Sequence, residues 1–387
     1  MAASISITHL IVRLDTGGAE KSLFRLIRAT SEQLDHRVVC LGPESQIAAD
    51  IARLGVDVVC LDYPRTGPLA LWRALRLLRR QPPQVLQGWM YLGNLLAALF
   101  ALVLPRPIRV GWNVRSSLGR LSDEKFATRA SVRLGGWCCR FASTRPDLIV
   151  YNSHAGQLSH KVFGFNGGYP VVIYNGIDTD EFAPNHANRM SVRGRFGFET
   201  GEDDAILVGL VARYHRVKGV NEFVRAAARL CAVRARDWHF ALVGGGMSED
   251  NEELMGYIHD SGIPRERIKL VGEISDTPAF LPGLDLLVVA SLREGTPNAL
   301  LEAMACGVNV VGTDVGDVAA IVNDRQRVAA PGDVADLVRK IDNAVAADHL
   351  ELTARVQAGR AFVAEHYATE QCMAAYVHTY ELLMQAR

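Results

Sequence analysis

The chain has 387 residues, of which 49 % are hydrophobic, so it is too long for one ordinary core and long enough for two. Its 42 basic and 42 acidic side chains give a net charge of zero, but residues 1–177 carry 21 basic against 11 acidic side chains, and the remainder carries the opposite excess. No nucleic-acid motif accompanies the basic excess, which weighs against a nucleic-acid-binding protein.

An apolar run over residues 5–12 predicts the first strand, and apolar positions at 23, 24, 26 and 27 predict a helix after it. Gly17 and Gly18 lie at the turn between them. Glycines at such a turn let a backbone approach a phosphate closely, although a tight turn from strand to helix needs glycine in any case. The pattern Gly-x-Gly-x-x-Gly occurs neither here nor at residues 244–246, which disfavours a dinucleotide-binding dehydrogenase.

The basic side chains of the first part gather in two segments, 72–80 and 115–145, where arginines mix with tryptophan and phenylalanine. A basic amphipathic surface with aromatic residues fits an anionic membrane face, at roughly 1 kcal/mol per basic residue near the surface. A solvated helix face and a nucleic-acid patch are the competing interpretations. The pattern favours an anionic membrane surface or a lipid-linked acceptor as the partner of this part.

The most apolar segment, residues 95–104, is too short to cross a bilayer, which takes about 20 residues. It predicts instead a buried helix that begins after Gly93 and Asn94 and ends at Pro105. The amino terminus has no basic region ahead of an apolar one, so we expect no secretory signal. The seven cysteines show no metal-ligand spacing and are expected to be buried thiols in a reducing cytoplasm.

A domain boundary is predicted after the apolar run 171–174, because Asn175 and Gly176 are a turn signal and residues 178–195 are polar. Strands and helices alternate on both sides of this boundary, which is typical of parallel, doubly wound α/β sheets. The expected parts are residues 1–176, residues 177–368 and a last helix over residues 369–387.

A predicted strand over residues 206–211 is followed by Arg213 and Lys218 on one short loop, and a helix is expected from about Asn221. Ligands of open α/β sheets bind at the carboxyl ends of the strands. Two cations on that loop could together neutralise a diphosphate leaving group. The alternative is that both are merely exposed loop residues.

Two further strands, predicted over 284–290 and 307–312, enclose one short helix. Thr296 is expected to cap its start, Pro297 to occupy the first helical position, and Gly307 to end it in a left-handed conformation. The free backbone N–H groups of the first turn then form an anion site that suits a phosphate. The residues concerned are Asn298, Ala299 and Leu300.

Glu294 precedes this helix and Glu302 lies one turn inside it. Two carboxylates beside a phosphate would repel it unless they accept hydrogen bonds from something neutral and rich in hydroxyl groups. Sugar hydroxyls on both sides of a diphosphate meet that need, with ribose at one glutamate and a hexose at the other. The alternative is a solvated Glu294 and an ordinary helical Glu302.

Taken in order along the chain, these motifs resemble the family 4 retaining glycosyltransferases of bacterial exopolysaccharide and lipopolysaccharide assembly. The motifs are Gly17-Gly18-Ala19-Glu20, Asn175-Gly176-Ile177-Asp178, Arg213 to Gly219, Gly244-Gly245-Gly246, and Glu294 with Glu302. The resemblance implies the GT-B fold, in which two Rossmann-like doubly wound domains face a central cleft. The first domain then binds the acceptor and the second the nucleotide sugar, and the last helix crosses back to the first.

The resemblance also implies roles for the residues of the second domain. Arg213 and Lys218 would hold the donor diphosphate, and Glu302 the ribose. Glu294 would hold hydroxyls of the transferred sugar, so Arg213, Lys218 and Glu294 are the expected catalytic residues. The backbone near Gly272, over residues 271–273, would contact the base.

In the first domain, the resemblance implies that Gly17 and Gly18 close over the phosphates. Many relatives carry a histidine after a strand of this domain, facing the 6-hydroxyl of the sugar. The corresponding stretch here, residues 110–117, contains no histidine. Asn113, Arg115 and Ser116 are the acceptor-side residues that stand in its place.

The expected activity is metal-independent transfer of a hexose, with retention, from a UDP or GDP sugar to a glycan or a polyprenyl-diphosphate-linked acceptor. We expect no cofactor, because cations and a helix start can stabilise the departing diphosphate and no convincing Asp-x-Asp loop is present. Asp203, Asp204 and the pair Asp178 and Asp180 are better interpreted as turn residues. The expected location is the inner face of the cell membrane, as a peripheral cytoplasmic protein.

Three other functions fit the same fold. A nucleotide-sugar epimerase would act on the donor without any acceptor, and a phosphorylase would need a lysine-bound pyridoxal phosphate. A non-catalytic membrane scaffold would carry a decayed nucleotide site. The presence of Arg213, Lys218, Glu294 and Glu302 argues against decay.

Overall fold

The protein is seen here as a computed structural model that describes residues 4–15, 17–104, 107–116, 135–198, 205–233 and 236–386. The chain divides into two compact units. The first unit comprises residues 1–176 with 369–387, and the second comprises residues 177–368. Within the basic segment 115–145, residues 117–134 lie outside the described residues.

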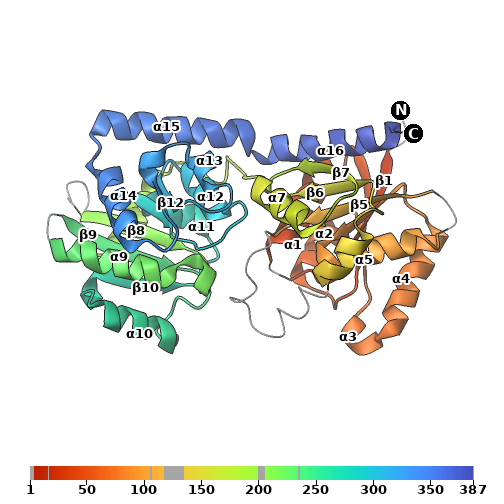
Figure 1. Ribbon diagram of the computed structural model, residues 1–387, viewed down its shortest axis with the longest axis horizontal. Helices are drawn as coiled ribbons and strands as arrows, with labels where there is room; N and C mark the ends of the chain where they lie inside the picture. The colour runs from red at the N-terminus through yellow and green to blue at the C-terminus, as the bar shows by residue number, and fades with distance from the viewer. Residues whose placement is uncertain are drawn as a thin grey trace. The chain divides into compact units, whose positions relative to one another are not determined.

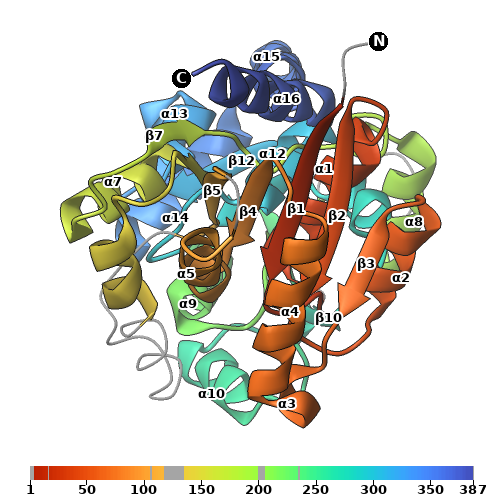
Figure 2. The same ribbon diagram turned by 90° about the vertical axis from the view of Figure 1, so that its right-hand side faces the viewer.

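The first unit is built on a seven-stranded parallel sheet with the order β3-β2-β1-β4-β5-β6-β7 (Figures 1 and 2). Its strands are β1 (Ile5–Ile11), β2 (Leu34–Cys40), β3 (Asp57–Cys60), β4 (Val85–Trp89), β5 (Arg109–Val114), β6 (Leu148–Tyr151) and β7 (Tyr169–Val172). The strand order reverses between β1 and β4, so the crevice that binds ligands in such sheets is expected at the carboxyl ends of these two strands.

Helices cover both faces of this sheet. They are α1 (Gly18–Thr30), α2 (Gln46–Arg53), α3 (Tyr63–Thr66), α4 (Pro68–Arg80), α5 (Met90–Ala101), α7 (His154–Phe163) and α16 (Thr369–Gln385). One core joins the sheet to α1, α2 and α16, and the other joins it to α4 and α5. The last helix buries Met373, Tyr376 and Tyr380 in the first of these cores, so it is part of the first unit.

The helix predicted after Gly93 and Asn94 is wrong at its start, because α5 begins at Met90 and contains both residues. Gly93 permits this, since a Cβ atom there would lie 2.6 Å from the Leu10 carbonyl oxygen of β1. The helix therefore lies tightly on the sheet. Its outer side stays open: Leu99 is 49 % exposed. None of the described helices has an apolar stretch long enough to cross a bilayer.

A line of hydrogen bonds runs through the interior of the first unit. Trp89 Nε1 donates to His9 Nδ1 at 3.2 Å, and His9 Nε2 lies 3.0 Å from His36 Nδ1. His36 Nε2 lies 2.8 Å from the hydroxyl of Thr30, which donates to the Leu26 carbonyl at 2.6 Å. The indole can only donate, so His9 Nδ1 must accept and the proton of His9 is on Nε2. That proton is donated to His36 Nδ1, so the proton of His36 is on its Nε2 as well. Both imidazoles are therefore neutral.

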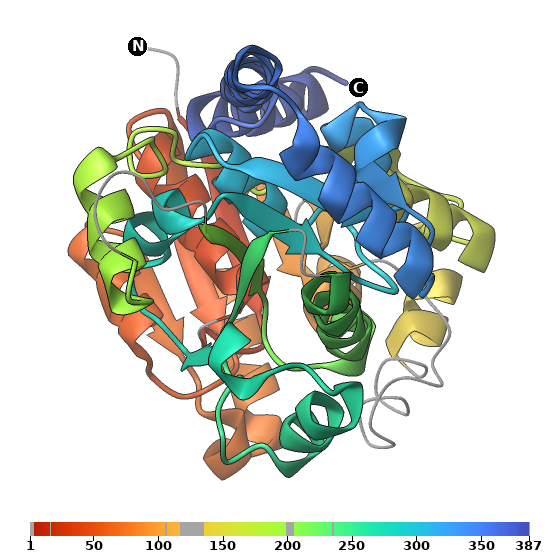
Figure 3. The ribbon, with the colours of Figure 1, turned by 90° about the vertical axis from the view of Figure 1, so that its left-hand side faces the viewer.

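The second unit is built on a six-stranded parallel sheet with the order β10-β9-β8-β11-β12-β13 (Figures 1 and 3). Its strands are β8 (Ala205–Val211), β9 (Asp237–Val243), β10 (Ile268–Gly272), β11 (Leu286–Val289), β12 (Asn309–Thr313) and β13 (Val328–Ala329). The order reverses between β8 and β11, which is the second expected binding edge. The predicted fold class, two doubly wound parallel sheets, is confirmed.

The helices of the second unit are α8 (His186–Arg195), α9 (Val220–Val233), α10 (Glu252–Ser261), α11 (Thr277–Phe280), α12 (Asn298–Ala305), α13 (Val318–Val322), α14 (Val334–Ala346) and α15 (His349–His366), with a 3-10 turn η2 (Arg216–Lys218). Its core is formed by apolar side chains of β8, β9 and β11 with those of α9, α10 and α14. Phe223 and Phe240 meet edge to face in this core, with ring centroids 5.8 Å apart.

Candidate functional site

The two loops that carry the predicted cations and glutamates meet at the reversal point of the second sheet. Arg213 and Lys218 follow β8, and Glu294 follows β11, and these strands are neighbours. The Leu292 amide donates to the Val217 carbonyl at 2.8 Å, which ties the two loops together through their backbones. The sheet order therefore brings together motifs that lie about 80 residues apart in the chain.

Gly219 is the residue that allows this approach. Its φ is +65°, and a Cβ atom there would lie 1.8 Å from the Ala290 carbonyl oxygen. A side chain at this position would push the β8 loop away from β11. The Lys-Gly sequence at the end of the loop thus combines a candidate site cation with the glycine that positions it.

Lys218 and Glu294 form an ion pair, with Lys218 Nζ 2.6 Å from Glu294 Oε1. The same oxygen accepts a hydrogen bond from the Ser291 hydroxyl at 2.8 Å. The Glu294 side chain is only 11 % exposed and that of Lys218 is 29 % exposed, so the pair is partly shielded from water. Sequence reasoning assigned these two residues to different parts of a ligand, and it missed both their pairing and the contribution of Ser291.

Arg213 is exposed just beyond β8. The residues on either side of it are fixed to the loop after β9: the Ala212 amide donates to the Val243 carbonyl at 2.9 Å, and the Tyr214 amide donates to the Gly245 carbonyl at 2.8 Å. An exposed guanidinium on an anchored backbone suits the binding of a phosphate.

The glycines after β9 and β10 close this edge of the sheet. Gly244 has a φ of +133°, and a Cβ atom there would lie 2.1 Å from the Ala212 carbonyl oxygen. Its amide donates to the Gly272 carbonyl at 2.7 Å. Gly272 has a φ of +76° and an open surrounding, since a Cβ atom there would meet no atom within 4 Å. The backbone at Gly272 therefore has open space around it, beside the loop after β9.

The start of α12 differs from the prediction. The helix covers Asn298–Ala305, and its N-cap residue is Pro297, which has an extended conformation and makes no side-chain cap hydrogen bond. The predicted cap at Thr296 is wrong, because the Thr296 hydroxyl instead donates to the Asp317 carboxylate at 3.1 Å. Gly307 has a φ of +74°, which confirms the left-handed end of the helix.

The first turn of α12 carries Asn298, Ala299 and Leu300, and Glu302 lies one turn further on. The Leu300 amide donates to the Pro297 carbonyl at 3.2 Å, so it is already engaged within the turn. Glu302 is partly buried. The positive end of the helix dipole lies at this first turn, and such a position favours an anion.

A second loop holds the segment before α12, and sequence reasoning missed it. Gly316 has a φ of +59°, and a Cβ atom there would lie 2.2 Å from the Gly295 carbonyl oxygen. That oxygen accepts a hydrogen bond from the Asp317 amide at 2.9 Å, while the Asp317 carboxylate binds Thr296. The loop after β12 therefore fixes the backbone next to Glu294. A glycine and an aspartate after a strand are too common to reveal this from sequence.

In the first unit, Gly17 precedes α1 and Gly18 is the first residue of this helix, which follows β1 at the reversal point of the sheet. Gly17 is the N-cap residue and has no side-chain cap. The Glu20 carboxylate turns back toward it: a Cβ atom at position 17 would lie 2.2 Å from Glu20 Oε2. Burial, with a contribution from Asp15, raises the pKa of Glu20. Thr16, on the same turn, lies outside the described residues.

The residues in and just after β5 that were predicted for the acceptor side have different surroundings. Asn113 is fully buried, and its amide group donates to the Tyr376 hydroxyl at 2.8 Å. Arg115 donates to the Asn175 side chain at 2.8 Å and lies over the Trp89 ring, with Cζ 5.4 Å from its centroid. Asn113 and Arg115 thus link β5 to its neighbours inside the first unit. Ser116, half-buried, follows the strand.

Within the described ranges, no group of three or more histidine, cysteine, aspartate or glutamate side chains could hold a metal ion. Asp178 accepts hydrogen bonds from the Asp180 and Glu181 amides at 3.3 and 3.0 Å, as a turn residue does. Asp203 and Asp204 lie outside the described residues.

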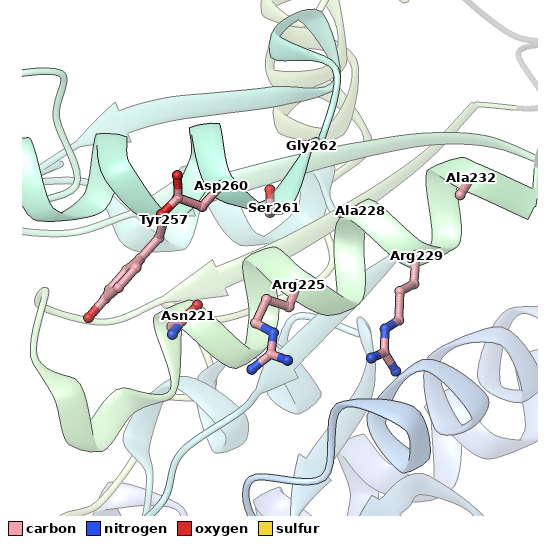
Figure 4. A pocket seen from close by; sticks show the side chains of 9 residues that line it. All are labelled: Asn221, Arg225, Ala228, Arg229, Ala232, Tyr257, Asp260, Ser261 and Gly262. Atoms are coloured by element: carbon pink, nitrogen blue, oxygen red, sulfur yellow. The ribbon is translucent and has the colours of Figure 1, made fainter.

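A hollow of about 570 Å³ lies between α9 and α10. Arg225 and Arg229 extend to the same side of α9, and Tyr257 and Asp260 come from α10 (Figure 4). None of the sequence motifs includes these residues. The hollow is a polar surface groove of the helical layer, and none of the residues that line it belongs to the loops after β8 and β11.

Two family descriptions match the chain. Residues 16–181 match Glycosyltransferase Family 4, and residues 205–347 match Glycosyl transferases group 1. The lipopolysaccharide core biosynthesis mannosyltransferase LpsB of Rhizobium meliloti is 31 % identical over 266 residues, which cover 67 % of this chain and 72 % of that protein. The lipopolysaccharide core biosynthesis glycosyltransferase LpsE of the same organism is 28 % identical, over 96 % of this chain and 98 % of that protein.

Solved structures with similar folds include Anabaena Alr3699/HepE in complex with UDP, with a TM-score of 0.81 and 18 % identity over 98 % of this chain and 100 % of that one. The glycosyltransferase WaaG, involved in lipopolysaccharide biosynthesis, has a TM-score of 0.70 and 15 % identity over 97 % of this chain and 99 % of that one. At such identities the likeness shows the fold alone.

Proposed function

Because the chain belongs to glycosyltransferase family 4 and has the GT-B fold, we propose that it transfers a hexose from a nucleoside-diphosphate sugar to a glycan or lipid-linked acceptor. The observation that carries this proposal is the meeting of Arg213, Lys218, Glu294 and the start of α12 at the reversal point of the second sheet. The names of LpsB and LpsE support a role in cell-surface polysaccharide assembly, and the UDP complex of HepE supports a nucleotide donor.

The chemistry follows from where charge develops. As the bond from the anomeric carbon to the diphosphate breaks, negative charge grows on the leaving group and positive charge on the sugar. Arg213 and the start of α12 would stabilise the diphosphate, because fixed positive charges act most strongly on the charge that appears in the transition state. As the ion pair opens, hydroxyls of the sugar would accept a hydrogen bond from Lys218 or donate one to Glu294. We propose retention at the anomeric carbon and no requirement for a metal.

We also propose that the first unit docks on the anionic inner face of the cell membrane. Its helix α4 carries exposed Arg73, Arg76 and Arg79, and Arg76 lies over the ring of Trp72, with Cζ 5.2 Å from the centroid. Trp72 itself is 54 % exposed. Exposed aromatic and basic side chains on one helix support binding at a lipid headgroup layer.

Calorimetric titration with UDP, GDP, ADP and NAD, each with and without EDTA, tests the donor site. We expect one nucleoside diphosphate to bind and EDTA to leave its affinity unchanged. Arg213→Ala should weaken that binding about tenfold, since a hydrogen bond to a charged group contributes about 1.5–3 kcal/mol. Arg225→Ala, which removes an exposed arginine on α9, is the matched control and should change nothing. Binding of NAD alone, or of no nucleotide, would overturn the proposal.

A further inference from the structure

An apolar pocket of about 240 Å³ opens at the binding edge of the first unit. Val12 and Arg13 follow β1, and Leu41 follows β2, so the pocket floor lies at the carboxyl ends of two neighbouring parallel strands. Its walls come from α3, α4 and α5 and include Pro64, Leu71, Leu92 and Leu96. This is the edge at which open α/β sheets bind their ligands, and no part of it was assigned a role from sequence.

Two turns in an unfavourable backbone conformation bring the walls into place. Asp62 and Met90 have φ angles of +49° and +61°, a region that residues with side chains rarely adopt. Asp62 directly precedes α3, which contributes Tyr63 and Pro64, and Met90 begins α5, which contributes Leu92. Strained residues persist where the surrounding structure enforces them, and they cluster at ligand sites.

The lining of the pocket excludes a sugar as its natural occupant. Apart from the Arg13 guanidinium and the Tyr63 hydroxyl, its lining side chains are apolar. Buried sugar hydroxyls would lose their hydrogen bonds to water and find few partners here, at a cost that apolar carbon does not incur. A hydrocarbon chain loses no hydrogen bonds when it enters the pocket, and it removes its own apolar surface from water.

The mouth of the pocket continues onto an exposed apolar rim. Leu92 and Tyr63, which line the pocket, are 48 % and 45 % exposed. Leu71 is followed directly by Trp72, which is 54 % exposed on the basic helix α4. Arg13 is 65 % exposed and its Nε lies 2.6 Å from Asp15, so a polar, charged group stands beside the apolar mouth. The site is therefore amphipathic, as a ligand with a hydrocarbon chain and a polar head requires.

We propose that this pocket binds the hydrocarbon chain next to the reacting end of an amphipathic, lipid-linked acceptor. The inference rests on the proposed function, because it names the class of acceptor for the same reaction. It narrows that function: of the two acceptor classes, a free glycan and a lipid-linked one, the pocket selects the second. The chain is either a prenyl or a straight acyl-type chain, and the two share the apolar chemistry that the pocket recognises.

The test is direct binding of short amphiphiles to the full chain, below their micelle concentrations and without any donor. The probes are farnesyl phosphate, dodecyl phosphate and inorganic phosphate, titrated by calorimetry. We expect farnesyl or dodecyl phosphate to bind at least about tenfold more tightly than inorganic phosphate. The tighter of the two identifies a branched or a straight chain as the natural one, and either result supports the proposal.

Two pocket variants and one matched control locate the site. Leu92→Asp places a carboxylate at the mouth, and Tyr63→Ser removes one wall; both positions are partly exposed, so folding should survive, and thermal melting checks this. Leu99→Asp is the control, because Leu99 lies on the same helix and is 49 % exposed but does not line the pocket. Both pocket variants should weaken amphiphile binding about tenfold, and the control should leave it within about twofold.

Three outcomes would overturn the inference. Amphiphiles that bind no better than inorganic phosphate would show that the pocket does not take a chain. Equal losses of amphiphile affinity in the Leu92→Asp and Leu99→Asp variants would indicate that the amphiphiles adsorb to the surface of the helix instead. Dimerisation in light scattering that Leu92→Asp abolishes would make the pocket a contact between two copies. Nucleotide titration of the same samples separates this inference from the proposed function: if UDP or GDP binds and the amphiphiles do not, the inference alone fails.

Discussion

Lys218 and Glu294 neutralise each other in the second unit, and this changes what each contributes to ligand binding. With Nζ 2.6 Å from Oε1 and both side chains partly buried, neither charge is fully available to a ligand. A diphosphate can recruit Lys218 only if Glu294 finds another partner. Hydroxyls of a sugar are such a partner, and the Ser291 hydroxyl already holds Glu294 Oε1 in place at 2.8 Å. We therefore propose that the pair couples binding of the diphosphate to binding of the sugar.

Glu294→Ala tests this coupling. The substitution frees Lys218, so affinity for the bare nucleoside diphosphate should stay within about threefold of the parent or rise, whereas turnover should fall about 100-fold or more. Glu302→Ala should instead weaken nucleotide binding about tenfold, since a charged hydrogen bond is lost. Calorimetry with the nucleotide and steady-state kinetics with the nucleotide sugar measure the two effects. Equal losses of nucleotide affinity in both variants would contradict this division of roles.

The buried histidines of the first unit make a prediction about pH. Burial, with the neighbouring His36, holds the pKa of His9 well below its ordinary 6.5, and burial lowers the pKa of His36 to about 4. Both must stay neutral, because each imidazole accepts one hydrogen bond and donates another. As pH falls below 6.5 the unfolded chain binds protons that the folded chain refuses, so stability is complete above that pH and declines toward pH 4.

The expected loss is about 2 kcal/mol per histidine between pH 7 and pH 5. Urea unfolding at the two pH values measures it. His36→Gln should reduce this pH dependence, because one of the two groups no longer titrates. His259→Gln, which replaces a histidine whose side chain is 90 % exposed, should leave the dependence unchanged. An equal pH dependence in the parent and both variants would show that other groups are responsible.

At the scale of elements, the candidate site depends on loops that hold one another rather than on any single helix. The loop after β12 fixes the segment before α12, through Asp317 on one side and Gly316 on the other. The β8 loop contacts the end of β11 at Gly219. Because these contacts involve backbone atoms, small displacements of a loop move Glu294 and the start of α12 together.

Gly316→Ala is expected to disrupt this arrangement. Its φ of +59° is unfavourable for alanine, and the new methyl group would lie 2.2 Å from the Gly295 carbonyl oxygen. We expect a loss of stability of about 2 kcal/mol or more together with weaker nucleotide binding. Gly256→Ala in α10 is the control, because a Cβ atom there meets nothing within 4 Å, and alanine should stabilise that helix by about 0.5–1 kcal/mol. Denaturant unfolding compares the two variants, and a Gly316→Ala protein as stable as the parent would contradict the argument.

The elements themselves could be predicted well from sequence, and their side-chain partners could not. The strand predicted over 206–211 is β8, and the helix expected from about Asn221 is α9 from Val220, because hydrophobic patterning and strand–helix alternation are local properties. The cap at Thr296 was wrong because its hydroxyl is bound by Asp317, 21 residues away. The Lys218–Glu294 pair spans 76 residues and depends on sheet order, which local patterns do not encode.

At the scale of the whole molecule, the two units differ in surface character as well as in charge. Among the large apolar side chains exposed in the described ranges, all but Val233 and Leu350 belong to the first unit. They include Trp137 and Phe141, which are 54 % and 64 % exposed and stack edge to face. The first unit also carries the basic excess of the chain. Adsorption to an anionic bilayer requires exposed aromatic side chains on a basic surface. A surface that faces only water does not require them.

Vesicle flotation tests this difference. The protein should float with vesicles containing phosphatidylglycerol and not with pure phosphatidylcholine, and high salt should release it, because charges near a membrane are screened within about 10 Å at 0.1 M salt. Substituting Arg73, Arg76 and Arg79 on α4 together by alanine should weaken binding about 100-fold, at about 1 kcal/mol for each cation. Substituting Arg225 and Arg229 on α9, two exposed arginines of the second unit, provides the control. If both sets of substitutions weaken binding equally, general electrostatic attraction explains it. If only the first set does, α4 is part of the membrane-facing surface, and the apolar pocket that Leu71 of this helix lines lies next to the bilayer, where a lipid-linked acceptor would be found.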